Sequence, residues 1–473
     1  MTRLLTLTLA LLLLAAATTS MANDNYRMPD PALTALVDAP LQPASAVSPD
    51  RRWLAAFERK WVKPLEEVAR EELKLAGIRI DPVTYSRSRS GTYESMVLHD
   101  LGDGTMIPID GLPDGSRIAS PAWSPDSQHL AFTLDHEGKR TIWVYDLAER
   151  AARQLSNEPL NGVLTATPFE WIPDASGLLA NGAVNRGRAL PEPGIEAVAP
   201  VIQESDPNNK APVRTYQDLL QTPADGDKFA LLATGQLARL DLAGELAMLG
   251  EPGLISGFDA SPDTSYIVVE QIQRSFSYAV PFSRFAVRSD ILDAGGKRVV
   301  NVADLPVADN IPKGFDSVRT GRRSIQWRAD VAATLVWAEA LDGGDMRAEV
   351  EHHDQVYTWT APFEGSPKKL IATERRFAGI QWTESDFAML AEWRFSDRKL
   401  RIWKFEPDQP EVDLVQRRLE LGEQGLIHDP AERPHEQLQD LRPGVTGEKA
   451  VRGERRIELI AVGLEELADL LFL

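Results

Sequence analysis

One pattern of hydrophobic and polar positions recurs along the chain. An apolar residue, a further residue that is usually small and the pair Pro-Asp precede a run of apolar and β-branched residues. Clear copies begin at Val47, Trp123, Trp171 and Ala260, and degenerate copies begin at Trp327 and Trp382. Proline presets the backbone for the first corner of a tight turn, and an aspartate side chain accepts hydrogen bonds within it. Each copy therefore predicts a β-hairpin on a half-buried sheet.

Further strand-like segments follow the hairpins. Residues 141–147 and 152–155 supply a third and a fourth strand after the Trp123 copy. Four short antiparallel strands, repeated radially, are the plan of a β-propeller. For residues 44–410 we therefore predict an all-β fold, a β-propeller of about seven four-stranded blades. About six signatures are visible, which leaves open whether the last blade is complete. A β-sandwich is the alternative, but a sandwich does not need one turn repeated so often.

Two segments depart from the blade pattern. Residues 64–77 predict an amphipathic helix inserted into the first blade, because Pro64 suits a helix start and Gly77 a helix end. Its apolar face would hold Leu65, Val68, Ala69, Leu73 and Ala76. Residues 185–213 are rich in Pro, Gly and Asn and predict a long surface loop, a common place for binding function.

The N-terminus predicts export. Residues 1–22 are expected to be a signal peptide, with Arg3 as the positive region and residues 4–17 as an apolar run too short to span a membrane comfortably. Small residues at 20–22 suit cleavage before Asn23, so residues 23–43 would form an N-terminal extension. The predicted localisation is periplasmic or secreted, with no membrane span after cleavage. An uncleaved anchor is the alternative.

The composition changes sharply near residue 406. Of the 34 aromatic residues in the chain, only Phe472 lies beyond that point, and the blade pattern stops at the same place. Residues 411–473 are charged and helix-permissive. They are interpreted either as a native helical appendage or as a tail translated in a shifted reading frame, and the abruptness of the change favours the shifted frame.

Charge and composition exclude several classes of site. The formal net charge is −19, whereas nucleic-acid binding needs a basic surface, so we expect no nucleic-acid partner. The absence of cysteine excludes disulfides and thiolate chemistry. On a strand, Glu351 and His353 would share one face, but two ligands are too few for a metal, and a solvated strand end is the simpler interpretation. No phosphate-binding Gly-rich loop is present, so we expect neither a metal nor a cofactor.

Segments outside the repeat carry a family resemblance. They include residues 72–81, 111–115, 213–220 and 280–285, and the most specific is 317–330 (SVRTGRRSIQWRAD), followed by 337–339 and 342–345. Residues 40–410 resemble the N-terminal propeller region of the glutamyl endopeptidase branch of the prolyl oligopeptidase family, which includes the chloroplast-type glutamyl peptidases. The resemblance implies a seven-bladed propeller that caps an α/β-hydrolase domain, admits short or unfolded peptides and belongs to a serine peptidase that cleaves after Glu.

The chain departs from that family pattern in one respect. A Gly-x-Ser-x-Gly elbow, which presents the nucleophilic serine in such a domain, is absent from the sequence, and only 68 residues follow Phe405. No catalytic Ser, Asp or His can therefore be assigned. Whether this chain is itself an enzyme stays open, and we expect it to be inactive alone.

Three arginines stand out in this acidic protein. Arg319, Arg322 and Arg323 are candidates for binding a substrate carboxylate, because a guanidinium group binds a carboxylate through two hydrogen bonds. The alternative is a loop held by internal salt bridges.

We therefore expect the substrate-gating propeller part of an exported serine peptidase. Its partners would be peptides or a protein, including a separately encoded hydrolase domain. The second interpretation is a non-catalytic periplasmic propeller that binds a protein partner through residues 185–213 and the three arginines. A third is a remnant with open strand edges that folds poorly.

Overall fold

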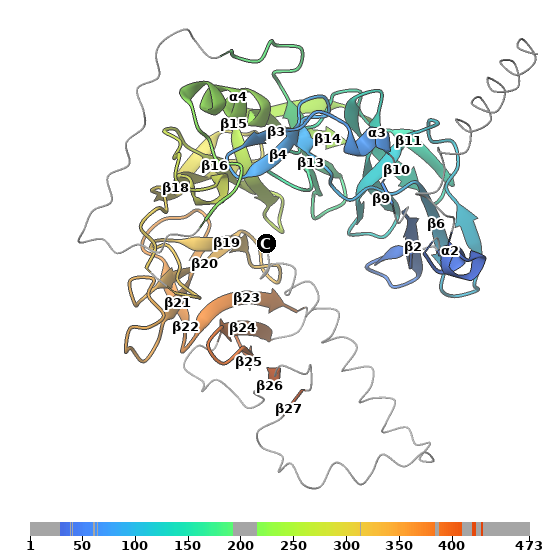
Figure 1. Ribbon diagram of the computed structural model, residues 1–473. Coiled ribbons are helices and arrows are strands. Elements are labelled where there is room, and N and C mark those ends of the chain that lie inside the picture. The colour runs from blue at the N-terminus through green and yellow to red at the C-terminus, as the bar shows by residue number, and fades with distance from the viewer. Residues whose placement is uncertain are drawn as a thin grey trace, which may run out of the picture.

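The computed structural model shows a molecule built mostly from β-strands, with few helices (Figure 1). The residues that the structure describes are 29–37, 39, 41–59, 62–63, 65–192, 215–312, 314–383, 387–408, 419–421 and 427–428. The signal peptide predicted at 1–22 and most of the loop predicted at 185–213 lie outside the described residues. In the part of the chain that is described, no helix has the length and apolar character needed to cross a membrane.

The first half of the chain forms three antiparallel sheets, numbered here in chain order. Sheet 1 consists of β1 (Ala44–Val47), β2 (Trp53–Glu58), β6 (Ser95–Asp100) and β7 (Met106–Pro108). Sheet 2 consists of β8 (Arg117–Trp123), β9 (His129–His136), β10 (Lys139–Asp146) and β11 (Ala151–Gln154). Sheet 3 consists of β12 (Phe169–Trp171), β13 (Gly177–Ala183), β14 (Gly235–Asp241) and the first half of β15 (Leu246–Ala260).

Three further sheets follow the same plan. Sheet 4 consists of the second half of β15, β16 (Tyr266–Ile272), β17 (Val287–Asp293) and β18 (Arg298–Leu305). Sheet 5 consists of β19 (Arg323–Trp327), β20 (Thr334–Ala340), β21 (Asp354–Thr360) and β22 (Lys368–Thr373). Sheet 6 consists of β23 (Arg376–Trp382), β24 (Ala388–Arg394), β25 (Lys399–Phe405), β26 (Leu419–Leu421) and β27 (Ile427–His428).

Strands that follow one another within a sheet pair antiparallel, which is the blade unit of a β-propeller. The sheets succeed one another along an arc, from β2 and β6 in blue, through β16 and β18 in yellow-green, to β23–β25 in orange (Figure 1). The mostly-β prediction is confirmed. The described residues form six such units, of which sheets 3 and 4 are continuous through the shared strand β15. A total of about seven therefore stays a prediction.

The recurring turn joins the first and second strands of its sheet. In sheet 2, the Ser124 hydroxyl donates to Asp126 Oδ1 at 2.5 Å and accepts from the His129 amide at 2.9 Å. The residue after the aspartate has a positive φ, 60° at Ser127. The copies at Ser48 and Ser261 repeat these hydrogen bonds. The motif therefore works as a side-chain-capped turn, as its residues predict.

Tryptophan at the start of the motif ties neighbouring sheets together. The Trp123 indole N–H donates to the Ala46 carbonyl of sheet 1 at 3.1 Å. Trp171 donates to Ala122 at 3.0 Å, and Trp327 donates to Asp259 at 3.1 Å. Each acceptor immediately precedes the motif of the preceding sheet, so the same latch joins successive first strands.

The inserted helix was predicted too long. Helix α3 spans only Leu65–Val68, and a small three-stranded sheet of β3 (Leu73–Leu75), β4 (Ile78–Asp81) and β5 (Ser86–Arg87) follows it. We call the β3–β4 part of this sheet the inserted hairpin. Ala76 and Gly77 have φ of 53° and 83°, the signature of a two-residue hairpin turn. A Cβ at Gly77 would lie 2.4 Å from Pro281 Cβ, so the tip of the hairpin docks closely on that loop. This tertiary contact outweighs the helical periodicity.

Two acidic residues of that segment, Glu67 and Glu72, are held in ion pairs and do not form a solvated helix face. Glu67 binds Lys63 at 2.7 Å and Arg117 at 2.6 Å, and its side chain is 10% exposed. Glu72 binds Arg79 at 3.1 Å. Ion pairing therefore ties the segment to sheet 2.

The predicted helical tail is also partly wrong. Leu419–Leu421 pairs with β25 as a fourth strand of sheet 6, and Ile427–His428 pairs with it in turn. The domain boundary predicted at residue 410 thus falls before the last strands of a sheet. The rest of residues 411–473 lies outside the described residues.

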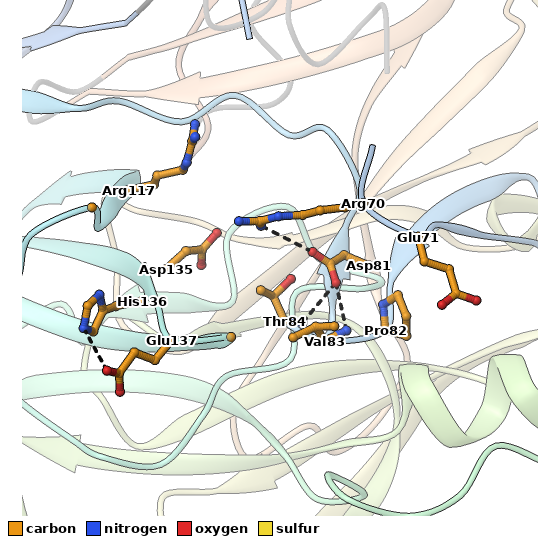
Figure 2. Close-up of a pocket in the computed structure, with 12 residues that line it drawn as sticks. Arg70, Glu71, Asp81, Pro82, Val83, Thr84, Arg117, Asp135, His136 and Glu137 are labelled. Atoms are coloured by element: carbon orange, nitrogen blue, oxygen red, sulfur yellow. Dashed lines mark hydrogen bonds and ion pairs between the residues drawn. The ribbon is translucent and has the colours of Figure 1, made fainter. Parts of the chain in front are cut away.

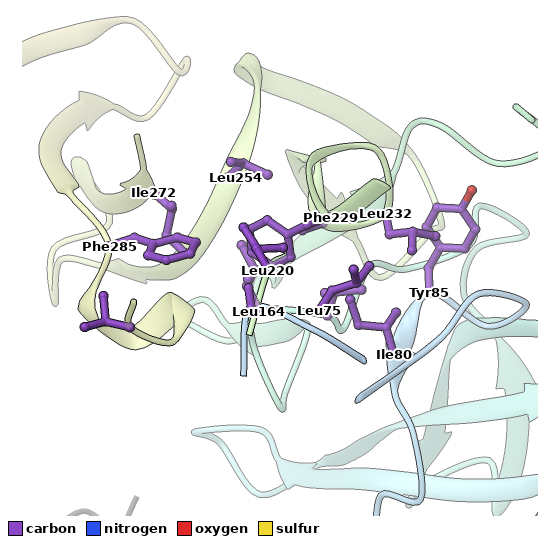
Figure 3. Close-up of a cluster of buried hydrophobic side chains, with 14 residues drawn as sticks. Leu75, Ile80, Tyr85, Leu164, Leu220, Phe229, Leu232, Leu254, Ile272 and Phe285 are labelled. Atoms are coloured by element: carbon purple, nitrogen blue, oxygen red, sulfur yellow. The ribbon is translucent and has the colours of Figure 1, made fainter. Parts of the chain in front are cut away.

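One face of the molecule carries the long connections. Residues 59–94, 184–234, 273–286 and 341–353 each link a second strand to a third. Because neighbouring strands run in opposite directions, each link emerges at the edge of its sheet where the first strand of that sheet begins. We call this side of the molecule the insertion face. A hydrophobic layer covers part of it and includes Phe229 of α4 (Pro223–Ala233), Ile80 of β4 and Phe285 (Figure 3).

Candidate functional site

Arg322 occupies an aromatic site. Its guanidinium lies 4.6 Å from the centre of the Trp337 ring and 5.8 Å from that of Trp359. It donates to the Val302 carbonyl at 2.7 Å, and Glu339 lies 3.6 Å away. The cation is thus held by aromatic faces, a carbonyl and a carboxylate of the protein.

Arg323 belongs to a buried ionic cluster. It pairs with Asp354, whose side chain is fully buried. Asp354 also accepts from Arg376 at 2.8 Å and from the Phe377 amide at 2.7 Å. Because an uncompensated buried carboxylate is strongly destabilising, Arg323 and Arg376 are needed there for charge balance.

His353 lies in the same cluster. Its Nδ1 is 2.7 Å from Asp342 Oδ2, and the residue is buried. The expected solvated strand end is therefore wrong, because the side chain turns inward to a carboxylate that Arg376 also binds. Within the described residues, no group of three or more His, Asp or Glu is placed to hold a metal ion.

Arg319 is held differently from its two neighbours. It donates to the Ser283 carbonyl at 3.0 Å and to the Phe285 carbonyl at 3.5 Å. Among the described residues, no carboxylate lies within 4.0 Å of its guanidinium. Burial, and then the positive charge of Arg284, lower the pKa of Arg319, whereas Glu270 acts in the opposite direction. The structure thus separates the three arginines and, among the described residues, leaves Arg319 without a carboxylate at ion-pair distance.

A cavity of about 310 Å³ opens between the inserted hairpin and sheet 2 (Figure 2). Arg70 lies 3.9 Å from Asp81 at its centre, and Asp81 accepts from the Val83 amide at 2.8 Å. Asp135 is paired with Arg140 at 2.7 Å. Most charged side chains around the cavity are therefore paired within the protein. No sequence pattern had indicated this cavity.

Two carboxyl groups near the first strands have displaced pKa values. Desolvation, and then repulsion by Asp259, raise the pKa of Glu170 to about 8, although the residue keeps solvent contact. Desolvation raises the pKa of Asp259 to about 7. Glu170 lies on β12 and Asp259 on β15, in adjacent sheets. No motif marked either residue, because their proximity exists only in the folded sheets.

Glutamyl endopeptidases are among the sequence relatives of this chain. The probable chloroplastic glutamyl endopeptidase of Oryza sativa subsp. japonica is 36% identical over 408 residues, which cover 83% of this chain and 43% of that protein. The Arabidopsis thaliana counterpart is 36% identical over 401 residues, 82% of this chain and 41% of that protein. The chain is homologous to the N-terminal region of the glutamyl endopeptidases. It spans less than half the length of these relatives.

Other likenesses are more distant. A Tol-Pal system protein TolB from Anaeromyxobacter dehalogenans is 29% identical over 93 residues, 20% of this chain and 21% of that protein. No family model matches the chain.

Solved structures of peptidases also resemble the fold. Pyrococcus horikoshii acylaminoacyl peptidase has a TM-score of 0.39 at 16% identity, covering 78% of this chain and 45% of its own. The propeller domain of the Trilobed protease from Pyrococcus furiosus has a TM-score of 0.39 at 12% identity, covering 82% and 93%. Scores of this size add nothing to what the sheets themselves show.

Proposed function

We propose that this chain is the substrate-gating propeller of a serine peptidase that cleaves peptides after Glu. The observation that carries the proposal is the 36% identity to glutamyl endopeptidases across 408 residues. That stretch covers 83% of this chain, far more than a repeated propeller turn alone would account for. The propeller would restrict the peptides that reach a catalytic domain.

The catalytic chemistry would come from outside the described sheets. A hydrolase domain presents its serine on a Gly-x-Ser-x-Gly turn, and this sequence holds no such turn. We propose that the purified chain is inactive alone and acts with a hydrolase domain that is fused to it or separately encoded. Export to the periplasm, directed by residues 1–22, is part of the same proposal.

Strand direction indicates where such a domain would sit. In a four-stranded antiparallel sheet, the first strand begins on the side where the fourth strand ends. The chain therefore enters β1 and completes the fourth strand, β26, on the insertion face, whereas β27 runs back antiparallel to β26. We propose that the domain docks on the insertion face, where the long connections lie. The long connections of that face are then placed to contact both the domain and its substrate.

Association can be tested directly. The purified chain is mixed with the separately produced region of the rice relative that lies beyond its own match, and complex formation is followed by sedimentation velocity. We expect a saturable one-to-one complex. A TolB protein serves as the matched propeller control and is expected not to bind. Binding by TolB equal to that of this chain, or binding by neither, would contradict the proposal.

A non-catalytic binding propeller is the second candidate. It is favoured by the match of 93 residues to TolB. That match covers a fifth of this chain, whereas the glutamyl endopeptidase match covers four-fifths, so the peptidase assignment is the stronger.

A further inference from the structure

Two arginines on the insertion face lie side by side without carboxylate partners. Arg284 ends the 3-10 turn η1 (Phe282–Arg284), and Arg319 lies in the connection between β18 and β19. Among the described residues, neither guanidinium has a carboxylate within the 4.0 Å of an ion pair. The positive charge of Arg284 acts on Arg319, and Glu270 counters it only from beyond ion-pair distance, in a protein whose net charge is −19.

The backbone fixes this arrangement. Arg319 donates to the carbonyls of Ser283 and Phe285, the residues on either side of Arg284. Phe285 is fully buried in the hydrophobic layer, where it packs beside Phe229 and Ile272 (Figure 3). The turn is thus anchored below by an aromatic side chain and held from the side by Arg319.

Arg284 is positioned but not neutralised. Its guanidinium lies over the Tyr216 ring, 5.8 Å from the centre, and its Nη1 is 3.5 Å from the Ala308 carbonyl. Both contacts are weak for a cation, and a carbonyl 3.5 Å away is at the limit of hydrogen bonding. The side chain is half-buried, so its remaining N–H groups can reach a ligand at the surface.

We propose that Arg284 and Arg319 form a carboxylate clamp on the insertion face, which binds an acidic group of a peptide. Two guanidinium groups supply planar pairs of N–H donors that match a carboxylate. The ligand would supply the carboxylate that the described residues do not place within ion-pair distance of either arginine. This inference rests on the proposed function for its peptide ligand, but its geometry stands on the two arginines alone.

The carboxylate could come from a glutamate side chain or from a peptide C-terminus, and three labelled probes distinguish these sources. The first is a pentapeptide with a central Glu, acetylated and amidated at its ends, and the second has Gln in place of Glu. The third has no acidic side chain but a free C-terminal carboxylate. Fluorescence anisotropy with the full 473-residue chain measures each affinity up to millimolar concentrations.

We expect the Glu probe to bind about tenfold tighter than the Gln probe, the size of one charge-assisted hydrogen-bond pair. Arg284→Gln should reduce that ratio to near one while leaving the hydrogen bonds of Arg319 in place. Arg284→Lys should restore only part of the ratio, because lysine keeps the charge without the fork. Arg298 is an exposed arginine at the start of β18 in sheet 4, so Arg298→Gln is the matched control. This variant should leave the ratio of Glu to Gln affinity unchanged.

Several outcomes would overturn the clamp. Equal affinity for all three probes, no binding of any probe, or an equal loss in the Arg298→Gln control would each do so. Tighter binding of the third probe than of the Glu probe would assign the clamp to a peptide C-terminus. Failure here, with a complex still forming in the sedimentation experiment, would leave the proposed function standing; the converse would leave the clamp standing without it.

Discussion

At the residue scale, the pair Glu170 and Asp259 makes stability depend on pH. Their pKa values of about 8 and about 7 lie above the ordinary 4.5 and 3.8 of the unfolded chain. The folded state therefore binds more protons than the unfolded state between pH 4 and 8. The contribution of the two groups to the free energy of unfolding is fully present below the pKa values of the unfolded chain. It is lost as the pH rises through the pKa values of the folded protein.

We therefore expect the urea midpoint of unfolding to fall between pH 5 and pH 8.5. The double variant Glu170→Gln, Asp259→Asn cannot titrate and should flatten this slope, with little change at pH 5. Chemical denaturation at four pH values measures it. If the double variant keeps the slope of the wild type, another group is responsible.

Single residues also show where sequence reasoning ended. The three clustered arginines were recognisable as unusual, yet spacing alone could not separate them. Arg322 enters a pair of tryptophan rings and Arg323 a buried cluster, because their partners come from β20 and β21, distant in sequence. Arg284 gained its relevance only from the hydrogen bonds that Arg319 makes around it.

At the element scale, the tryptophan latches join one sheet to the next. Three indole N–H groups reach the equivalent carbonyl of the preceding sheet, whereas the buried indole N–H of Trp382 has no acceptor among the described residues. The copy in sheet 4 has Ala260 at that position, so it offers no latch toward sheet 3.

Trp123→Phe removes the indole donor and keeps an aromatic ring. We expect it to lower the free energy of unfolding by about 1–3 kcal/mol, because the Ala46 carbonyl loses its partner. Trp382→Phe is the matched control and should be less destabilising. Urea unfolding of both variants provides the comparison, and a larger loss at Trp382 would contradict the role assigned to the latch.

The inserted hairpin shows why an element can be misread. Residues 64–77 satisfy a helical pattern, but leucines at 73 and 75 and isoleucines at 78 and 80 also alternate with period two around a two-residue turn. The structure selects the hairpin because its tip packs against Pro281 and donates to the Asp218 carbonyl at 2.8 Å. Neither partner is visible locally in the sequence.

Gly77→Ala tests that docking. Its Cβ would approach Pro281 Cβ to 2.4 Å at a φ of +83°, so we expect a loss of roughly 2 kcal/mol or more from overpacking and left-handed strain. Gly91→Ala, where nothing lies within 4 Å, is the control and should be near neutral. Thermal unfolding compares them; equal effects would mean that the hairpin tip is not held as described.

At the scale of the whole molecule, repetition made the fold predictable. The turn recurs because each sheet needs the same capped corner, so one motif predicts the sheet plan from residue 44 onward. The last sheet was cut short in that prediction because its outer strands, β26 and β27, lie beyond the change in composition at residue 406. No catalytic residue could be assigned, because the sequence holds no Gly-x-Ser-x-Gly turn.

The measurement that tests the central claim most directly is turnover by a graft. Residues 44–428, which include the outer strands of sheet 6, replace the matching region of the rice relative. Cleavage of a quenched peptide with a single Glu is then compared with cleavage of a long unfolded protein containing the same site. The account predicts Glu-dependent cleavage of the peptide within about tenfold of the parent rate, and strong preference for it over the long chain. A folded graft without activity, or one that cuts both substrates alike, would contradict the assignment of this chain as a gating propeller.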